Sequence, residues 1–93
     1  KITVRDLNEE DISSRKLNES TKGVVIMEIS NMSPLKGLLN VNDIIIEVQK
    51  SPITKSSDLN DVVNKMKKRG DKNLLLSIMD KDNQRRYLGV KLN

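Results

Sequence analysis

The segment SNMSPLKGLLNVNDIIIEV, residues 30–48, decides the fold of this chain. A Ser-Pro pair and a short Leu-rich turn come first, and an Asn-Asp elbow at residues 42–43 then leads into an almost unbroken apolar run. A short apolar run rich in isoleucine and bounded by turn residues predicts a strand that is buried on both faces in its first half. The polar elbow predicts that the chain enters this strand through a tight turn.

The composition limits the kind of core that the chain can form. Its 93 residues are enough for one domain with a modest core, and they include one Tyr but no Phe or Trp. Ile, Leu, Val and Met must therefore build the core, and aromatic platforms for stacking the bases of single-stranded nucleic acid are missing. Because the chain begins with Lys and not Met, we expect residues 1–93 to be a single domain of a larger protein.

The chain contains neither Cys nor His. This removes disulfides, thiolate chemistry, the commonest general base and the commonest metal ligand. The remaining routes to catalysis are Ser-Lys or paired-carboxylate chemistry, but Glu9, Glu10 and Asp11 are explained by the first turn of a helix. We therefore predict no catalytic residues, no metal and no cofactor. No apolar stretch has the length of a membrane span, so no direct membrane insertion is expected.

The net charge of +4 comes from 17 Lys and Arg against 13 Asp and Glu. Much of the excess lies in KMKKRGDK at residues 65–72 and in DKDNQRRY at residues 80–87. The first group closes a predicted helix just before Gly70, where cations complement the helix dipole. A well-terminated soluble helix explains it better than a phosphate-binding patch, and we predict no nucleic-acid partner.

The spacing of apolar residues predicts strands that alternate with helices. Strands are expected at residues 1–6, 22–30, 43–50, 73–79 and 85–92, with a turn or very short strand at 51–54. Helices are expected at residues 8–18 and 56–70, with a turn or single helical turn at 33–40. Asn8 is the expected cap of the first helix, and Ser56 or Ser57 that of the second. About five strands and two to three helices predict an α+β fold, a small, partly open barrel or sandwich capped by helices.

The order and spacing of these segments resemble the PDZ domain. In that family the deciding segment runs S-P-A-x-x-A-G-L-x-x-G-D-x-I-x-x-V-N-G. Here KGVVIMEI stands where the family has its G-V-x-V-x-x-V strand, and SPITKSSDL matches the G-x-P-I-x-S-x-x-D-L turn into the long helix. The inserted helix NEEDISSRKL before Gly23 is similar to that in HtrA/Deg-type (Do family) bacterial serine proteases, whose PDZ domains are circularly permuted relative to animal ones. The terminal RRYLGVKL is similar to the last PDZ domain of such a protease.

Four features depart from the family pattern. Asn42 replaces the usual Gly before Asp43, and Gln49-Lys50 replaces the usual Asn-Gly. The segment 34–39 is one residue short, and Lys1 falls where the family's carboxylate-binding loop has Gly. Because Asn tolerates the left-handed backbone conformation, we expect the elbow at residues 42–43 to survive.

The resemblance implies a peptide-recognition module of a periplasmic HtrA/Deg-type serine protease and chaperone of the bacterial cell envelope. Such a module binds hydrophobic C-terminal or extended segments of unfolded proteins, which add as a strand between the first strand and the long helix. The catalytic triad would lie on a separate domain, and the parent's other domains would be further partners. The peptide-binding residues implied are Lys1, Ile2, Thr3, Val4, Leu59, Val63 and Met66, with Val62 turned to the core.

Two alternatives stay open at this point. The apolar stripe at residues 59–66 has the spacing of an ordinary core-facing helix, and Ile2 and Val4 are ordinary strand core positions. The domain could also be an assembly or regulatory module that holds protease protomers together without binding free peptide. Site-2 membrane proteases and carboxy-terminal processing proteases carry PDZ domains as well, and are alternative parents.

Overall fold

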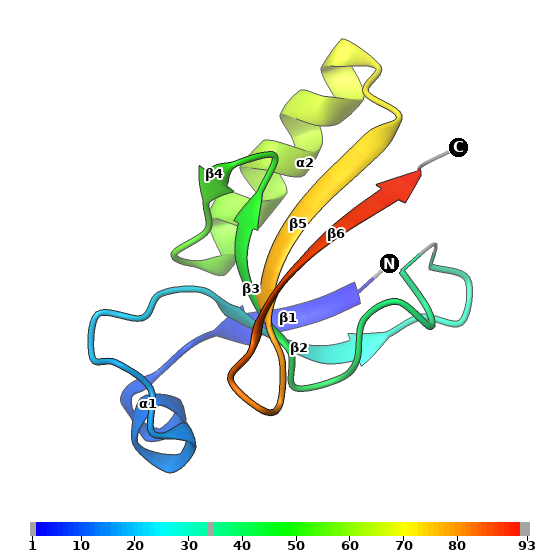
Figure 1. Cartoon of the computed structure of the whole chain (residues 1–93). Coiled ribbons are helices and arrows are strands. Elements are labelled where there is room, and N and C mark those ends of the chain that lie inside the picture. The colour runs from blue at the N-terminus through cyan, green and yellow to red at the C-terminus, as the bar shows by residue number, and fades with distance from the viewer. Residues whose placement is uncertain (1, 34, 92–93) are drawn as a thin grey trace.

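The computed structural model describes residues 2–33 and 35–91 of the chain (Figure 1). The strands are β1 (Ile2–Asp6), β2 (Val24–Ile29), β3 (Ile44–Val48), β4 (Ser51–Pro52), β5 (Asn73–Met79) and β6 (Arg85–Lys91). The helices are α1 (Glu9–Arg15) and α2 (Ser56–Arg69). This order confirms the predicted alternation and the α+β class. Within these described ranges, no helix is both long and apolar enough to cross a membrane.

The strands form one antiparallel sheet that stays open. Its order is β1-β2-β3-β5-β6, and the short β4 pairs with β3. Because β1 and β6 lie at the two ends of this order, the sheet does not close into a complete barrel. Helix α2 lies beside β4 and β5, whereas α1 lies at the opposite end of the molecule, near the turn between β5 and β6 (Figure 1).

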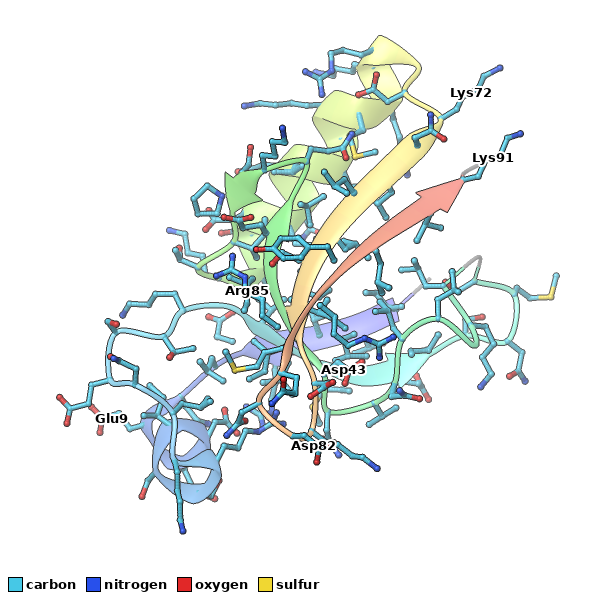
Figure 2. The ribbon with its side chains drawn as sticks, in the orientation of Figure 1. Glu9, Asp43, Lys72, Asp82, Arg85 and Lys91 are labelled. Atoms are coloured by element: carbon cyan, nitrogen blue, oxygen red, sulfur yellow. The ribbon has the colours of Figure 1, made fainter. Side chains whose placement is uncertain are left out.

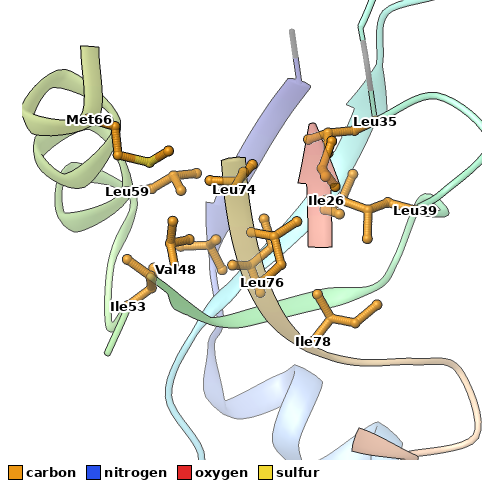
Figure 3. Close-up of a cluster of buried hydrophobic side chains, with 13 residues drawn as sticks. Ile26, Leu35, Leu39, Val48, Ile53, Leu59, Met66, Leu74, Leu76 and Ile78 are labelled. Atoms are coloured by element: carbon orange, nitrogen blue, oxygen red, sulfur yellow. The ribbon is translucent and has the colours of Figure 1, made fainter. Parts of the chain in front are cut away.

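The main core is aliphatic and lies between the sheet and α2. Leu59 and Met66 point from the helix towards Leu74 of β5, with Val48 and Leu76 beneath them (Figure 3). The buried members of this cluster are Val24, Ile26, Leu35, Leu39, Ile45, Val48, Ile53, Leu59, Met66, Leu74, Leu76, Ile78 and Val90. With no Phe or Trp in the chain, branched aliphatic side chains fill the space that aromatic rings often occupy.

The elbow before β3 is held by local hydrogen bonds. Asn42 adopts the left-handed conformation (φ +79°), as expected for an Asn in place of Gly. Its N–H donates to the carbonyl of Ile26 at 2.8 Å. The buried Asp43 carboxylate accepts from the Asn40 N–H at 2.9 Å, which closes the turn from inside (Figure 2). These hydrogen bonds hold the turn directly before the first residue of β3.

The turn between β3 and β4 keeps a left-handed geometry without the Asn-Gly pair. Gln49 has φ +54° and Lys50 has φ +66°, and Val48 pairs with Ser51 across this two-residue turn. Positive φ at both central residues is the geometry that Asn-Gly favours. The Gln49 side chain also accepts from the Leu75 N–H at 2.7 Å and donates to the Asn73 carbonyl at 3.1 Å. It thereby extends the pairing of β5 beyond the end of β3.

The two helices begin in different ways. Asn8 caps α1 as predicted, because its side chain accepts from the Asp11 N–H at 2.9 Å. The prediction that Ser56 or Ser57 caps α2 is wrong: the N-cap position is Lys55, whose side chain makes no capping hydrogen bond. The Ser56 N–H instead donates to the Asp6 carboxylate at 2.8 Å. The Asp58 carboxylate, in the first turn of α2, accepts from the Lys55 N–H at 3.3 Å, so the start of α2 is held by one carboxylate from β1 and one of its own.

Gly23 precedes β2 in a space that admits no side chain. A Cβ at this position would lie 2.6 Å from the Ile45 carbonyl oxygen and 2.8 Å from Ile44 Cγ2. We expect Gly23→Ala to lower the free energy of unfolding by about 2–3 kcal/mol, measured by urea denaturation, because the backbone must move to relieve the overlap. Gly89→Ala is the control, since a Cβ there meets nothing within 4 Å. Equal midpoints for the two variants would contradict this account.

Lys50 is strained by its positive φ, and glycine would relieve that strain. We expect Lys50→Gly to raise the free energy of unfolding by about 0.5–1 kcal/mol, seen as a higher thermal midpoint. Lys65→Gly, at an exposed position inside α2, should lower it by about 1 kcal/mol. A Lys50→Gly variant less stable than the parent would show that the Lys50 side chain stabilises the turn by contacts that outweigh the strain.

Candidate functional site

An apolar pocket opens between the start of β1 and helix α2. It has a volume of about 440 Å³ and is lined by residues from β1, β3, α2 and β5, from the turn after β2 and from the connection after α2. The apolar lining residues are Ile2, Leu35, Ile45, Val48, Leu59, Val63, Met66, Leu74 and Leu76. The polar ones are Ser33, Asn60, Lys67 and Asp71. A concave, mostly apolar site with a few polar groups at its rim is the usual form of a binding pocket.

Strand β1 leaves one edge open beside this pocket. Among the described strands it pairs with β2 alone, so its other edge has no strand partner. Helix α2 packs near that edge. An open strand edge exposes backbone N–H and C=O groups that an extended chain can pair with. The open edge of β1 and the pocket together form a groove, which we call the β1–α2 groove.

The structure brings four of the seven predicted site residues together in this pocket: Ile2, Leu59, Val63 and Met66. Thr3 and Val4 lie further along β1 and do not line the pocket, and the β1–β2 register shifts between them. Lys1 lies outside the described residues. Val62 packs against the main core and is not part of the pocket lining.

Leu59 and Met66 belong to the pocket and to the core at once. Both are members of the buried cluster, and both line the pocket. The alternatives left open by the helical spacing, core stripe or pocket wall, therefore do not exclude each other. Val63 is only half-buried, so of the three helix residues it is the most accessible from the groove.

The Asp6–Ser56 hydrogen bond sets the direction of the groove. It joins the last residue of β1 to the first residue of α2 at 2.8 Å. At the other end, Ile2 shares the pocket with Met66 and Lys67 from the last turns of α2. Strand and helix therefore run in opposite directions along the groove, with the pocket beside the start of the strand.

Sequence reasoning missed the polar rim of the pocket and part of its floor. Leu35 and Leu74 come from segments far from β1 in the sequence, and no spacing pattern connects them to it. Asn60 and Lys67 are seven residues apart and so lie on one side of the helix, next to the apolar stripe. This seven-residue spacing could have indicated a polar rim in the sequence, but the solvent-exposed face of any helix shows the same spacing.

An ion pair between Arg5 and Asp11 joins β1 to helix α1. The Arg5 guanidinium donates to both carboxylate oxygens of Asp11, at 2.7 and 2.8 Å. Asp11 also accepts from the Asn8 N–H at 2.9 Å. The Arg5 hydrogen bonds, aided by the Asn8 N–H, lower the pKa of the Asp11 carboxyl from its ordinary value of 3.8 to about 2. Through this pair α1 holds the strand that borders the groove.

A second hollow lies elsewhere on the sheet and has a volume of about 370 Å³. Glu47, Lys50, Leu75, Leu76, Ser77 and Tyr87 line it. Leu75 and Tyr87 are 39% and 67% exposed, and Tyr87 is the only aromatic residue of the chain. We call this surface the Tyr87 patch.

The described residues contain no group of three acidic side chains that could hold a metal ion. Every buried side-chain nitrogen or oxygen among them has a hydrogen-bond partner. The β1–α2 groove offers a strand edge, an apolar pocket and a short polar rim, which are the features of a recognition site.

Comparison with known proteins agrees with this geometry. A sequence model of the PDZ domain family matches residues 2–92. The HtrA3 PDZ domain bound to a phage-derived ligand, FGRWV, is 23% identical, with a TM-score of 0.69 over 98% of this chain and 78% of that chain. The HtrA-type protease AlgW with a decapeptide is 21% identical, with a TM-score of 0.71 over 97% of this chain and 27% of that chain. At these identities the likeness concerns the fold. No curated protein sequence matches the chain at a significant level.

The lowered pKa of Asp11 predicts how the free energy of unfolding depends on pH. Because its pKa in the folded chain, about 2, lies below the ordinary 3.8, the unfolded chain takes up this proton first. The stabilisation is complete above pH ~4 and is lost as the pH falls towards ~2. It should amount to about 1–2 kcal/mol, a discounted figure because the Arg5 side chain is 37% exposed.

The measurement is urea denaturation of the parent and Asp11→Asn between pH 2 and 7. The parent should lose more stability than the variant as the pH falls from ~4 to ~2, so that the two curves converge. Glu19→Gln, at an exposed position, is the control and should follow the parent. Parallel curves for the parent and Asp11→Asn would contradict the role given to the Arg5 pair.

Proposed function

This chain belongs to the PDZ domain family, and we propose that it binds apolar C-terminal or extended peptide segments in the β1–α2 groove. The segment adds as a strand to the open edge of β1, and its last side chain enters the apolar pocket. A PDZ domain is a non-catalytic interaction module, and this one carries neither His nor Cys.

The observation that carries the proposal is the position of the pocket at the start of an unpaired strand edge. The open edge of β1 supplies backbone hydrogen bonds to any sequence, while the pocket accepts one side chain. Leu59, Val63 and Met66 give this pocket an aliphatic wall, which favours apolar side chains. Met66 adapts its shape readily, so several apolar side chains fit.

The expected affinity is low. Each backbone hydrogen bond contributes about 1 kcal/mol net, and burying one aliphatic side chain contributes about 2 kcal/mol. Ordering each flexible side chain of the segment costs about 0.5–1.5 kcal/mol. The balance predicts weak, exchangeable binding, which suits a module that samples many unfolded proteins.

Two ligands described for similar structures support this assignment. The HtrA3 PDZ domain holds the peptide FGRWV, which ends in Val, and AlgW is described with a decapeptide. By analogy we propose an HtrA/Deg-type serine protease and chaperone of the bacterial periplasm as the parent. The hydrolase chemistry would reside in a separate domain, and this domain would deliver substrates or regulate access to that chemistry.

A second candidate function is assembly, and the Tyr87 patch favours it. Tyr is enriched among the residues that dominate protein interfaces, and Tyr87 lies exposed beside this hollow. In this alternative the domain holds protease protomers together by contact with a neighbouring domain, and it binds no free peptide.

The test is an NMR titration of the domain with a pentapeptide that ends in Val and has a free carboxylate. We expect amide shifts confined to residues 2–6 and 59–66. Val63→Glu places a charge in the apolar pocket and should weaken binding by about tenfold or more. Asn64→Glu adds the same charge at an exposed neighbouring position outside the pocket, and is the control.

Three outcomes decide between the candidates. Shifts in the β1–α2 groove that Val63→Glu abolishes support peptide binding there. No shift with the pentapeptide, or equal losses in Val63→Glu and Asn64→Glu, would sink that proposal. Concentration-dependent self-association that Tyr87→Ala removes would favour the assembly function instead.

A further inference from the structure

Strand β6 forms the second open edge of the sheet. Among the described strands it pairs with β5 alone, so the backbone groups on its far side have no strand partner. The strand is seven residues long, against five in β1. Alternate residues of an edge strand direct their N–H and C=O groups away from the sheet. This row of groups, which we call the β6 edge, can pair with a further extended segment.

The β6 edge is basic. Five of its seven residues are exposed, among them Arg85, Arg86 and Lys91, and the strand contains no acidic residue. Arg85 and Lys91 lie at its two ends (Figure 2). A guanidinium nitrogen of Arg85 lies 3.6 Å from a carboxylate oxygen of Glu47, whereas no ion pair among the described residues involves Arg86 or Lys91. The edge therefore presents positive charge to any chain that pairs with it.

Gly89 lies inside β6 at a position where the fold itself does not require glycine. Its φ is not positive, and a Cβ there would meet nothing within 4 Å. Glycine inside a strand lowers the stability of the strand and often marks a place where another chain approaches closely. Across the sheet Gly89 pairs with Leu75, which is 39% exposed. The missing side chain thus leaves a gap beside an uncovered apolar residue.

Arg85 and Tyr87 border this gap on one side and Lys91 borders it on the other. These residues share one face of β6 with Gly89, because side chains alternate along a strand. The Arg85 guanidinium lies 5.7 Å from the centre of the Tyr87 ring, and its Nε donates to Ser77 Oγ at 2.9 Å. Arg85 is therefore held in place on this face, next to the Tyr87 patch.

We propose that the β6 edge is a second binding site, which takes an extended segment with acidic side chains on both sides of a bulky apolar one. In antiparallel pairing the apolar side chain stands opposite Gly89 and lies across it towards Leu75. Acidic side chains two positions before it and four positions after it then stand opposite Lys91 and Arg85. The inference is independent of peptide binding in the β1–α2 groove, because β1 and β6 are at opposite ends of the strand order.

The charges of β6 favour an acidic segment over a second copy of this chain. Two antiparallel β6 strands would bring the Arg and Lys side chains of both copies together, and like charges opposite one another destabilise a strand pair. Such charges protect an edge strand from pairing with itself. An acidic segment replaces this repulsion with attraction, and its apolar side chain fills the gap at Gly89, which the cations alone do not explain.

The test compares two peptides that are blocked at both ends, acetyl-ETWTVTE-amide and its charge-reversed form acetyl-KTWTVTK-amide. Each is titrated into the isotope-labelled domain by NMR up to about 5 mM, because a single strand edge binds a flexible peptide weakly. Lys91→Gln removes one cation from the edge, and Lys68→Gln removes one from an exposed position on α2 as the control. Gly89→Val fills the gap, with a residue that strands favour.

We expect the acidic peptide to shift the backbone amide signals of residues 85–91 and of their partners on β5. The charge-reversed peptide should bind at least about fivefold more weakly, because each cross-strand charge pair becomes repulsive. Lys91→Gln should weaken binding of the acidic peptide by about two- to fivefold, less at high salt, and Lys68→Gln should weaken it less. Gly89→Val should weaken it by about threefold or more, because the Trp side chain loses its place.

Any of four results would overturn the inference. The first is the absence of shifts along β6 with the acidic peptide, or shifts confined to residues 2–6 and 59–66. The second is equal binding of the two peptides, and the third is an equal loss in Lys91→Gln and Lys68→Gln, which would show only an effect of net charge. The fourth is a set of shifts along β6 that follow protein concentration without peptide, which would assign the edge to a second copy.

Discussion

The hydrogen bond from the Ser56 N–H to the Asp6 carboxylate, 2.8 Å long, is the contact on which the binding groove depends. The first N–H groups of a helix have no partner within the helix, and the N-cap residue of α2, Lys55, has a side chain that makes no capping hydrogen bond to them. A carboxylate at that position satisfies one of these groups and also complements the positive end of the helix dipole. Because Asp6 ends β1, the bond at the start of α2 also joins the two walls of the groove, at the end away from the pocket.

The hydrophobic core and the binding pocket share residues. Leu59, Met66 and Leu74 belong to both, so the pocket is the part of the core that the open sheet leaves uncovered. Shrinking any of them would remove contacts from the fold and change the shape of the pocket together. Positions at the rim are free of this coupling, since Asn60 and Lys67 are exposed. Specificity can therefore change at the rim without loss of stability.

Much of the fold could be predicted from the sequence, because local patterns determine it. The spacing of apolar residues gave the element types, Asn8 and Gly70 gave helix ends, and Asn42 was correctly expected to keep the elbow. The carboxylate from β1 at the start of α2 could not be predicted, because Asp6 lies fifty positions earlier in the chain. The left-handed turn at Gln49 and Lys50 was also hidden, since neither residue favours positive φ and the Gln49 side chain has its partners on β5.

The candidate site also contains residues that local sequence patterns predict and residues that only the packing of distant segments brings together. The helix residues Leu59, Val63 and Met66 followed from periodicity and family resemblance, whereas Leu35 and Leu74 depend on how distant segments pack. The polar rim depends on pairing that only three-dimensional contacts reveal: Asp71 accepts from Arg69, whereas no ion pair among the described residues involves Lys67. Backbone pairing along β1 is indifferent to sequence, and an aliphatic pocket separates apolar side chains by little more than their size. Discrimination between ligands of similar apolar character must therefore come from the few polar and charged groups at the rim of the pocket.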